Sequence, residues 1–338
     1  MYSLFDDPNA PIKKLVKLGF NQPEPQSCVQ MSGGLINETW NIDNIWVLQR
    51  VNPIFGPAVN DDIAALTPIL RQHAVTVPML CKASNGEWSV EGSNYGATQG
   101  RWRLMTMLPG TSIYKTDDIE QIRELTRAIA RFHLALDGCY YQFQHKRPGV
   151  HAFTRHYAAL EKTVESSEYK SHRLWSDVNA LFEKIKYMSN FVDYNSVMAC
   201  EVLRIIHGDP KISNFMFENG VISGIVDLDT MARSRIAFDI GDAIRSWCNP
   251  RAEDDEPAYN REFAREVLGL YQEEMPGLTH DERVSLPISA PFITLELAMR
   301  FAKDALCEDY FGFYPEIGHG EHSLMRAKAM YELCGQML

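Results

Sequence analysis

The sequence has no excess of basic residues, and this shortage limits the classes of partner. Its 33 Lys and Arg residues are outnumbered by 44 Asp and Glu residues, so the formal net charge is −11. Nucleic acids and anionic membrane surfaces are bound through basic patches. We therefore expect neither a nucleic-acid nor a membrane partner, whereas a cationic small molecule is permitted.

Cysteine patterns and targeting segments are also missing. The seven cysteines are scattered, odd in number and never spaced as C-x-x-C, so we expect neither a zinc site nor a disulfide framework. The first residues do not combine a basic region with an apolar run, as a signal peptide would. No uncharged apolar stretch approaches the roughly 20 residues that span a bilayer. The expectation is a cytoplasmic protein with reduced thiols.

The pattern with most chemical content lies at residues 204–229, RIIHGDPKISNFMFENGVISGIVDLD. It contains H-x-D, an Asn five residues after that Asp, and a further Asp beyond a predicted hairpin, which is the spacing of a kinase catalytic loop. The hairpin is predicted from two short apolar runs around Asn219-Gly220, because Asn-Gly tolerates the positive φ of tight turns. Gly224 is the predicted bulge. Such a hairpin returns Asp227 to the side of Asn214.

Phosphoryl transfer from ATP needs a proton acceptor, oxygen ligands for Mg²⁺ and positive charge near the γ-phosphate. Asp209 is the predicted general base, and Lys211 is the predicted charge at the transferring phosphate. Asn214 and Asp227 offer the hard oxygen atoms that suit Mg²⁺. His207 is interpreted as structural, holding the shape of the loop through backbone bonds.

Two other interpretations of this stretch remain open. Asp227-Leu228-Asp229 is a D-x-D pattern, which also occurs in metal-dependent glycosyltransferases, although that class gives Asp209 and Asn214 no role. The other interpretation is an inactive nucleotide-binding protein, because the Lys that a kinase carries on the strand equivalent to residues 45–51 is missing. This strand has Gln49 and Arg50 instead.

The first 110 residues contain candidates for nucleotide binding. Small residues at 32–34 stand between predicted strands, where glycine lets the backbone approach a phosphate. Arg50 keeps a positive charge near the position of the kinase Lys. A strand over residues 101–111 ends in Pro-Gly and resembles a hinge that bonds the adenine edge. The predicted nucleotide-binding residues are Gly33, Gly34, Asn37, Arg50, Thr106, Met107 and Leu108.

Apolar periodicity predicts helices on both sides of the catalytic pattern, over residues 11–20, 60–70, 118–137, 291–306 and 322–333. Within residues 233–247, Asp239 either caps a helix or binds a substrate hydroxyl, and Asp242 and Arg245 share a face as an ion pair. Arg300 lies among apolar residues, and a buried Arg needs an anionic partner. That partner is Glu296 one turn earlier, or the acceptor.

Taken together, these residues resemble the aminoglycoside phosphotransferase and choline kinase superfamily and, within it, the N-acetylhexosamine 1-kinases. The resemblance implies an α+β, bilobal, protein-kinase-like fold, with a nucleotide-binding lobe at 1–110 and a catalytic and acceptor-binding lobe at 111–338. It implies ATP and Mg²⁺ and phosphorylation of a small-molecule hydroxyl. The stretches that carry it are SGGLINETW at 32–40, VLQRVN at 47–52, HGDPKISNFMF at 207–217, VDLDTMARSRIAFDIGDAIRS at 226–246 and LELAMRFAKDALCEDYF at 295–311.

The resemblance leaves the acceptor open. Tyr310 is carried over as a sugar contact, with Asp239 and Arg300 as the other predicted substrate residues. However, Met231-Ala232-Arg233 stands where the sugar 1-kinases have Pro-Gly, and the segment 307–310 is shortened. An amino-sugar or related sugar is the first expectation, and an unpaired Arg300 favours it. A cationic alcohol such as choline or an aminoglycoside is the alternative.

Overall fold

The computed structural model describes residues 7–31, 37–146 and 149–338. The chain divides into two compact units, the first formed by Met1–Pro109 with Gln142–His145 and the second by Gly110–Tyr141 with Lys146–Leu338. The predicted lobes, 1–110 and 111–338, differ from these units at Gly110 and at residues 142–145. The functions predicted for the lobes stay predictions.

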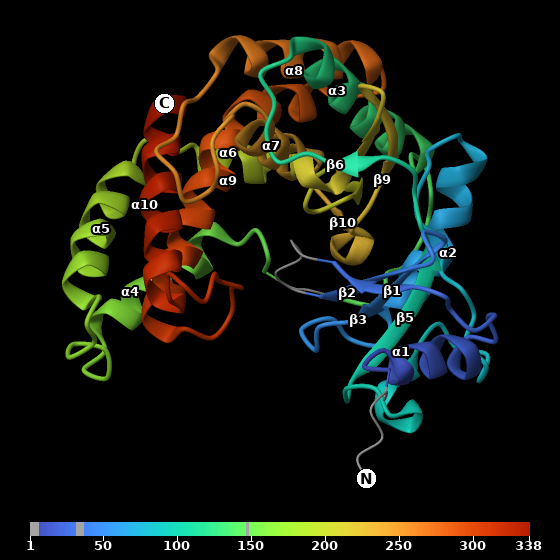
Figure 1. The fold of residues 1–338 in the computed structure, drawn as a ribbon. Helices are drawn as coiled ribbons and strands as arrows, with labels where there is room; N and C mark the ends of the chain where they lie inside the picture. The colour runs from blue at the N-terminus through green and yellow to red at the C-terminus, as the bar shows by residue number, and fades with distance from the viewer. Residues whose placement is uncertain (1–6, 32–36, 147–148) are drawn as a thin grey trace. The chain divides into compact units, whose positions relative to one another are not determined.

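The first unit is built on an antiparallel sheet (Figure 1). The strand order β1-β2-β3-β5-β4 places the central strands next to each other although β3 and β5 are far apart in sequence. Leu48 on β3 and Trp102 and Leu104 on β5 are fully buried on one face, as the alternation of side chains along a strand requires. The strands are β1 Cys28–Gln30, β2 Glu38–Ile42, β3 Trp46–Arg50, β4 Val90–Glu91 and β5 Arg101–Thr106.

The buried face of this sheet is covered by the N-terminal helix. Helix α1 (Ala10–Lys14) continues without a break into a π-helix, η1 (Leu15–Gly19), so the helix predicted over residues 11–20 is present but changes its winding. Leu15 and Phe20 share one core cluster with Leu48 and Trp102. The unit also contains α2 (Val59–Gln72) and the short 3₁₀ helix η2 (Gly92–Tyr95).

The connecting segment 142–145 belongs to the first unit because α2 binds it. The Asp62 carboxylate on α2 accepts the N–H groups of Gln144 and His145, each at 2.8 Å. Two charge-assisted bonds from one carboxylate to consecutive backbone donors hold the segment firmly. No spacing in the sequence predicts this contact.

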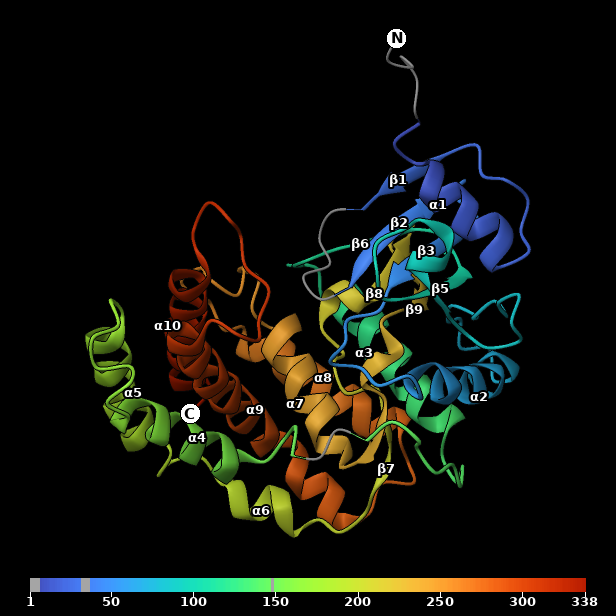
Figure 2. The same ribbon diagram turned by 90° about the horizontal axis from the view of Figure 1, so that it is seen from below.

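The second unit is mainly helical, with α9 at its centre. Figure 2 shows α9 between α7 and α10, and it packs against both. A capping box at Thr279 and Glu282 starts α9, which runs through Pro287 and Pro291, whereas the sequence predicted a start at Pro291. The helices are α3 Ile119–Ala135, α4 Phe153–Glu165, α5 Trp175–Met188, α6 Tyr194–Ala199, α7 Ile236–Trp247, α8 Arg261–Glu274, α9 His280–Cys307 and α10 His319–Met337.

Helix α9 is also the one helix of the described part that is long and apolar enough to cross a membrane by length and composition. Of its most apolar window, 72% is buried inside the structure. A core helix of a folded unit has this property, and no inference about a membrane is drawn from it.

Two small antiparallel sheets complete the second unit. β7 (Arg204–Ile206) pairs with β10 (Ala232–Ser234), and β8 (Phe215–Glu218) lies between β6 (Thr111–Ser112) and β9 (Val221–Ile225). Asn219 and Gly220 turn between β8 and β9 with φ of 53° and 82°, which confirms the predicted hairpin. The extra residue of the ladder is Ser223 rather than Gly224, because Met216 pairs with Gly224 and Phe217 with Ile222.

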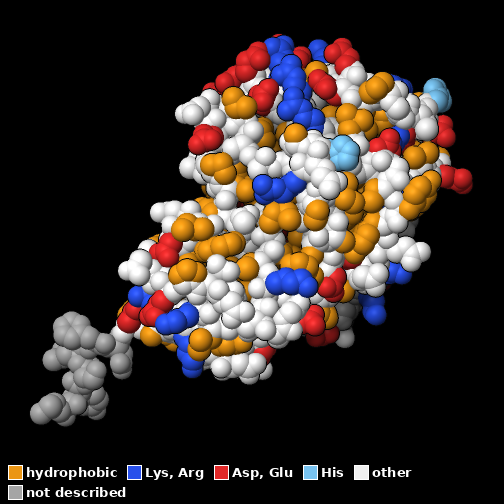
Figure 3. Space-filling model, turned by 90° about the vertical axis from the view of Figure 1, so that its right-hand side faces the viewer, with side chains coloured by type: hydrophobic (Ala, Val, Ile, Leu, Met, Phe, Trp, Pro, Cys, Tyr) orange, Lys and Arg blue, Asp and Glu red, His pale blue; other side chains and the backbone are white. Residues whose placement is uncertain are grey.

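On the face drawn in Figure 3, Lys and Arg side chains lie among Asp and Glu side chains in small groups. This mixture accompanies the acidic net charge of −11. The absence of nucleic-acid and membrane partners stays a prediction.

Candidate active site

The catalytic pattern forms a loop that leaves β7 and is held by a carboxylate from α7. Asp239 is completely buried. Its Oδ2 accepts the His207 N–H at 2.7 Å and its Oδ1 accepts the Gly208 N–H at 2.8 Å. His133 on α3 contacts the same Oδ2 at 2.9 Å. Burial opposes the charge of Asp239, but the His133 bond and the backbone donors outweigh it and hold its pKa below the usual value.

This arrangement corrects both roles predicted for Asp239. The helix begins at Ile236 with Arg235 as its N-cap, so Asp239 lies inside α7 and caps nothing. With both oxygens bonded and no exposed surface, it has no atom left for an acceptor. Asp239 is a positioning residue for the backbone of the catalytic loop.

His207 and Gly208 shape the start of the loop. The His207 Nδ1 accepts the Asp209 N–H at 3.3 Å, so its Nε2 carries the proton and donates to the Val226 carbonyl at 3.0 Å. This confirms the structural interpretation of His207. Gly208 has a φ of +85°, and a Cβ there would lie 2.3 Å from the Thr230 carbonyl oxygen. Only glycine fits this position.

Asp209 and Lys211, both partly exposed, meet the buried Asn214 at the end of the loop. The Lys211 ammonium lies 2.8 Å from the Asp209 Oδ2, with the two side chains 35% and 27% exposed. The Asn214 amide donates to the Asp209 carbonyl at 2.7 Å and to its Oδ2 at 3.2 Å. Burial acts to raise the pKa of Asp209, but Lys211 outweighs it, so the pKa is lowered and the carboxylate stays ionised.

The hairpin brings Asp227 next to Asn214, as predicted. The Val226 N–H donates to the Asn214 carbonyl at 2.9 Å. Asp227 itself has left-handed backbone angles, φ 63° and ψ 58°, a conformation that non-glycine residues adopt at a cost and that occurs at functional sites. Burial raises the pKa of Asp227, with Lys211 opposing the rise.

The oxygen atoms of this pair fit a magnesium ion. The Asn214 Nδ2 is used by Asp209, which leaves its Oδ1 as the free end of the amide, and Asp227 adds a carboxylate; both are hard ligands. Elsewhere in the residues that the structure describes, no group of three or more His, Cys, Asp or Glu is arranged to hold a metal. The fit is that of an ion whose remaining ligands come from a bound phosphate.

The end of α7 fastens the other side of the loop. The Ile212 N–H donates to the Ser246 hydroxyl at 3.0 Å, and the Trp247 indole donates to the Pro210 carbonyl at 2.8 Å. One turn earlier, Arg245 pairs with Asp242 at 2.7 Å, which confirms the ion pair predicted for these two residues.

The predicted substrate residues Arg300 and Tyr310 lie together. The Arg300 Nη2 is 3.5 Å from the Tyr310 hydroxyl. Glu296 does not pair with Arg300, since its Oε1 faces His151 at 3.3 Å and its Oε2 has no partner. Among the described residues Arg300 forms no ion pair. The prediction of a sugar acceptor required Arg300 to be unpaired, and this requirement is met.

In the first unit, Arg50 does not fit the predicted phosphate role. Arg50 is on the same face of β3 as the buried Leu48, and its Nε lies 2.8 Å from the Glu38 carboxylate. Its charge is therefore taken up within the sheet. The Asn37 Oδ1 accepts the Asn52 N–H at 2.9 Å and so fixes the chain after the predicted glycine loop. Gly33 and Gly34 themselves lie outside the described residues.

In the predicted hinge, two of the three backbone N–H groups are used within the first unit. The Thr106 N–H donates to the Met79 carbonyl at 3.0 Å, and the Met107 N–H donates to the Ile45 carbonyl at 2.8 Å. Neither N–H is available to adenine. Leu108 has no such bond recorded in the described part of the chain, and it is the remaining candidate donor.

Comparison with known proteins places this geometry in a family. Residues 27–275 match the phosphotransferase enzyme family, which is well over half of the chain. The chain belongs to this family. Solved structures agree on the fold: a microcompartment-associated aminopropanol kinase has a TM-score of 0.66 with 14% identity, covering 96% of both chains. The GDP complex of aminoglycoside 2'-phosphotransferase-IIIa has a TM-score of 0.61 with 15% identity, covering 96% of this chain and 99% of that one.

The predicted α+β, protein-kinase-like fold is thus confirmed for this chain. The predicted resemblance to aminoglycoside phosphotransferases is confirmed at the level of the family, and the resemblance to N-acetylhexosamine 1-kinases stays a prediction. Curated relatives include the homoserine kinase of Gluconobacter oxydans (strain 621H), 26% identical over 184 residues, which is 54% of this chain and 53% of that protein. The homoserine kinase of Rhizobium etli (strain CIAT 652) is 25% identical over 201 residues, 59% of this chain and 56% of that protein. The chain therefore spans about half the length of these relatives.

A cation that the sequence analysis missed lies on the other face of the first unit's sheet. Arg103 on β5 is 2% exposed, and its guanidinium contacts the Gln49 Oε1 at 2.6 Å and the Asn60 Oδ1 on α2 at 3.2 Å. This contact joins the sheet to α2 through a buried cation. The alternation of side chains along each strand could have revealed this contact. It places Gln49 and Arg103 on the same face, where they are directly paired across β3 and β5.

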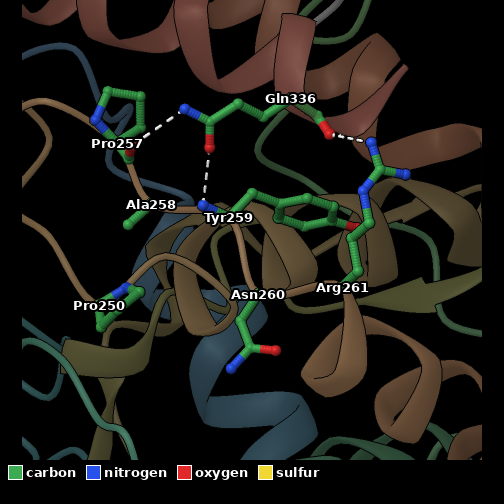
Figure 4. Close-up of a pocket in the computed structure, with 7 residues that line it drawn as sticks. All are labelled: Pro250, Pro257, Ala258, Tyr259, Asn260, Arg261 and Gln336. Atoms are coloured by element: carbon green, nitrogen blue, oxygen red, sulfur yellow. Dashed lines mark hydrogen bonds between the residues drawn. The ribbon is translucent and has the colours of Figure 1, made fainter.

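Two cavities lie in the described part of the second unit. One of about 810 Å³ lies beside the C-terminal turn of α10 (Figure 4). Its polar groups bond one another: Gln336 accepts the Tyr259 N–H and donates to the Pro257 carbonyl, and Arg261 donates to the Gln336 carbonyl. The other, of about 390 Å³, includes Arg204 and Arg233. Neither contains a predicted site residue.

Proposed function

We propose that this chain is an ATP-dependent kinase that transfers the γ-phosphate to a hydroxyl of a small molecule. The observation that carries the proposal is the cluster of Asp209, Lys211 and Asn214 on a loop whose backbone is fixed by Asp239. Family membership and the kinase names of the relatives agree with it.

Each residue of the cluster has a distinct task in this reaction. Asp209 is ionised and half-exposed, so it accepts the hydroxyl proton of the acceptor as that oxygen attacks. Lys211 stabilises the negative charge on the transferring phosphoryl group. Asn214 and Asp227 would hold Mg²⁺, which neutralises the phosphates and orients them when bound.

The alternatives lose their support in the structure. A glycosyltransferase D-x-D site gives Asp209 and Asn214 no role, whereas the structure brings these two residues together with Lys211. The inactive-protein interpretation rested on the missing strand lysine, whereas the retained Asp209, Asn214 and Asp227 and the kinase names of the relatives favour an active enzyme. Both alternatives are therefore ranked below a kinase.

For the acceptor, homoserine is the first candidate because the curated relatives are named homoserine kinases. An amino-sugar, the expectation from the sequence, is the second candidate, and the unpaired Arg300 favours it. Amino alcohols such as choline or aminopropanol, and aminoglycosides, complete the series.

The test is a panel of these acceptors incubated with Mg²⁺ and ATP and scored by mass spectrometry for phosphorylated product. We expect product with at least one acceptor and none when Asp209→Asn replaces the wild type at equal protein concentration. Equal product formation by both proteins would refute the assignment of the cluster, and no product from any acceptor would refute the proposed reaction.

A further inference from the structure

A buried arginine in the second unit forms no direct ion pair, although Glu253, Asp304 and Asp254 lie near enough to favour its charge. Arg326 on α10 is 4% exposed, and its guanidinium lies over the Phe301 ring, 4.3 Å from the centroid. Its Nη2 donates to the Gly312 carbonyl at 2.9 Å, but its Nε has no hydrogen-bond partner. No carboxylate of the described residues pairs with it. A buried guanidinium without a direct carboxylate contact is costly, and an anion bound at its free Nε would lower that cost.

A second unpaired arginine lies beside the first. Arg300 and Arg326 come from α9 and α10, and their guanidinium carbons lie 5.4 Å and 5.5 Å from the centroid of the same ring, Phe311. Two cations that share an aromatic neighbour repel each other unless an anion lies near them.

Contacts connect Arg326 to the catalytic loop through α7. The loop is bonded to Ser246, and its neighbour Arg245 pairs with Glu253 at 2.9 Å. The next residue, Asp254, lies 3.4 Å from His322 on α10. Arg245 also reaches Met330 on α10, at 4.0 Å from its sulfur. Arg326 is one turn from each of these two α10 residues, so α7 lies between it and the catalytic loop in this series of contacts.

A carboxylate oxygen without a partner lies in the same region. The Asp242 Oδ1 accepts from Arg245, whereas its Oδ2 is buried and makes no hydrogen bond. Burial raises the pKa of Asp242, and the nearby charge of Asp209 adds to the rise. A cationic donor at Oδ2 would relieve this cost.

We propose that the acceptor is a small zwitterion, a hydroxylated amino acid, whose carboxylate is bound by Arg326 with Arg300 beside it and whose ammonium is bound by Asp242. This inference rests on the proposed kinase function. It assigns opposite charges to opposite parts of the acceptor, and neither a sugar nor choline carries both.

The test uses three acceptors that differ by one group. L-homoserine carries both charges, 3-aminopropan-1-ol lacks the carboxylate and 4-hydroxybutyrate lacks the ammonium. For the wild type, we expect kcat/KM for L-homoserine to exceed that of each analogue about 10–100-fold, the usual value of one charge-assisted hydrogen bond. L-Serine and L-threonine are included to cover other chain lengths.

Two variants read the two contacts separately. Arg326→Met should lower kcat/KM for the amino acid about 10–100-fold and leave that for 3-aminopropan-1-ol and the KM for ATP unchanged. Asp242→Asn should remove the preference over 4-hydroxybutyrate. Arg261→Met, at the cavity of Figure 4, is the matched control and should change none of these values. Melting temperatures check folding, and Arg326→Lys, which keeps the charge, should retain part of the preference.

The outcomes separate this inference from the proposed function. A preference for neutral sugars or amino alcohols, or an Arg326→Met defect in the KM for ATP alone, would overturn the inference and leave the kinase standing. Calorimetric binding of L-homoserine that is lost in Arg326→Met, without product from any acceptor, would refute the kinase and with it the role of the amino acid as acceptor. If the protein neither binds nor phosphorylates any amino acid, the proposal of a zwitterionic acceptor is refuted.

Discussion

Single side chains decide the chemistry, and only some of them could be assigned from the sequence. Asp209, Lys211 and Asn214 are close in sequence, so their spacing already determines that they meet. Asp239 is different, because its bonds to the loop arise only when α7 packs beside β7. Arg326 was missed for the same reason, since the absence of a direct ion pair at its guanidinium is a property of the packing.

At this scale the first prediction concerns Asp209. Asp209→Asn keeps the shape of the side chain and removes its ability to take up a proton, so kcat should fall about 10²–10⁴-fold. Steady-state kinetics and ATP binding measured by calorimetry check this. A turnover within a few-fold of wild type would remove Asp209 from the role of base, and a loss of ATP affinity would assign it to the nucleotide instead.

The second residue-scale prediction concerns Asp227. Asp227→Ala should abolish turnover and weaken binding of Mg²⁺-ATP more than binding of metal-free ATP, because the carboxylate neutralises the ion and not the nucleotide. Titrations with ATP in the presence of Mg²⁺ and of a chelator measure the two affinities. Equal losses in both titrations would show that Asp227 is not a metal ligand.

Elements were predicted more fully than their details. The hairpin of β8 and β9 followed from Asn219-Gly220, and α3 followed from its apolar periodicity. The position of the bulge at Ser223 did not follow, because it depends on the pairing of β8 with β9 and not on composition. The start of α9 before two prolines was missed because proline usually marks the first turn of a helix.

The element-scale prediction compares two glycines with the same backbone conformation. Gly208 and Gly220 have φ of +85° and +82°, but a Cβ meets the Thr230 carbonyl oxygen at 2.3 Å at Gly208 and nothing within 4 Å at Gly220. Gly220→Ala should cost only the left-handed conformation, about 1–2 kcal/mol. Gly208→Ala adds a clash with backbone, so we expect a larger loss of stability and loss of activity.

Denaturant unfolding and turnover of the two glycine variants provide the measurement. Equal free energies of unfolding for Gly208→Ala and Gly220→Ala would contradict the close approach of the catalytic loop to Thr230.

For the whole molecule, the fold class and the family followed from motifs spread along the chain. The membership of residues 142–145 in the first unit did not, because it depends on two bonds from Asp62 to distant backbone groups. Long-range contacts of this kind leave no periodicity in the sequence.

Stability of the second unit depends on a buried ion pair between β7 and α9. Arg204 and Glu282 meet at 2.6 Å with side chains 10% and 1% exposed. Burial opposes ionisation of Glu282, but the Arg204 hydrogen bonds outweigh it and hold the pKa below its ordinary value of 4.5. A lowered carboxylate pKa stabilises the fold above the pKa of the unfolded chain, and this contribution is lost as pH falls through the folded pKa.

The whole-molecule prediction follows from this sign. At pH 7, Glu282→Gln should lower the free energy of unfolding by about 3 kcal/mol, the cost of breaking a buried pair. The difference from wild type should shrink below about pH 4.5, where the unfolded carboxylate is protonated. Unfolding curves at pH 7 and at lower pH measure it.

The matched control is an exposed pair. Arg173 and Glu321 meet at 2.7 Å but are 52% and 38% exposed, so Glu321→Gln should cost less than about 1 kcal/mol because solvent screens the charges. If the two variants lose the same stability, burial does not decide the strength of the Arg204–Glu282 pair.

The pairing of Lys211 with Asp209 has a consequence for how such an enzyme could change its acceptor. The two charges offset each other, and in the proposed reaction Mg²⁺ would neutralise the remaining carboxylate, Asp227, so the reaction centre itself would offer an approaching molecule little net potential. Discrimination by charge is left to side chains on α7, α9 and α10, which take no part in the chemical step. Retargeting the enzyme, in the laboratory or by natural variation, would then need substitutions in those helices alone, with the reaction centre reused unchanged.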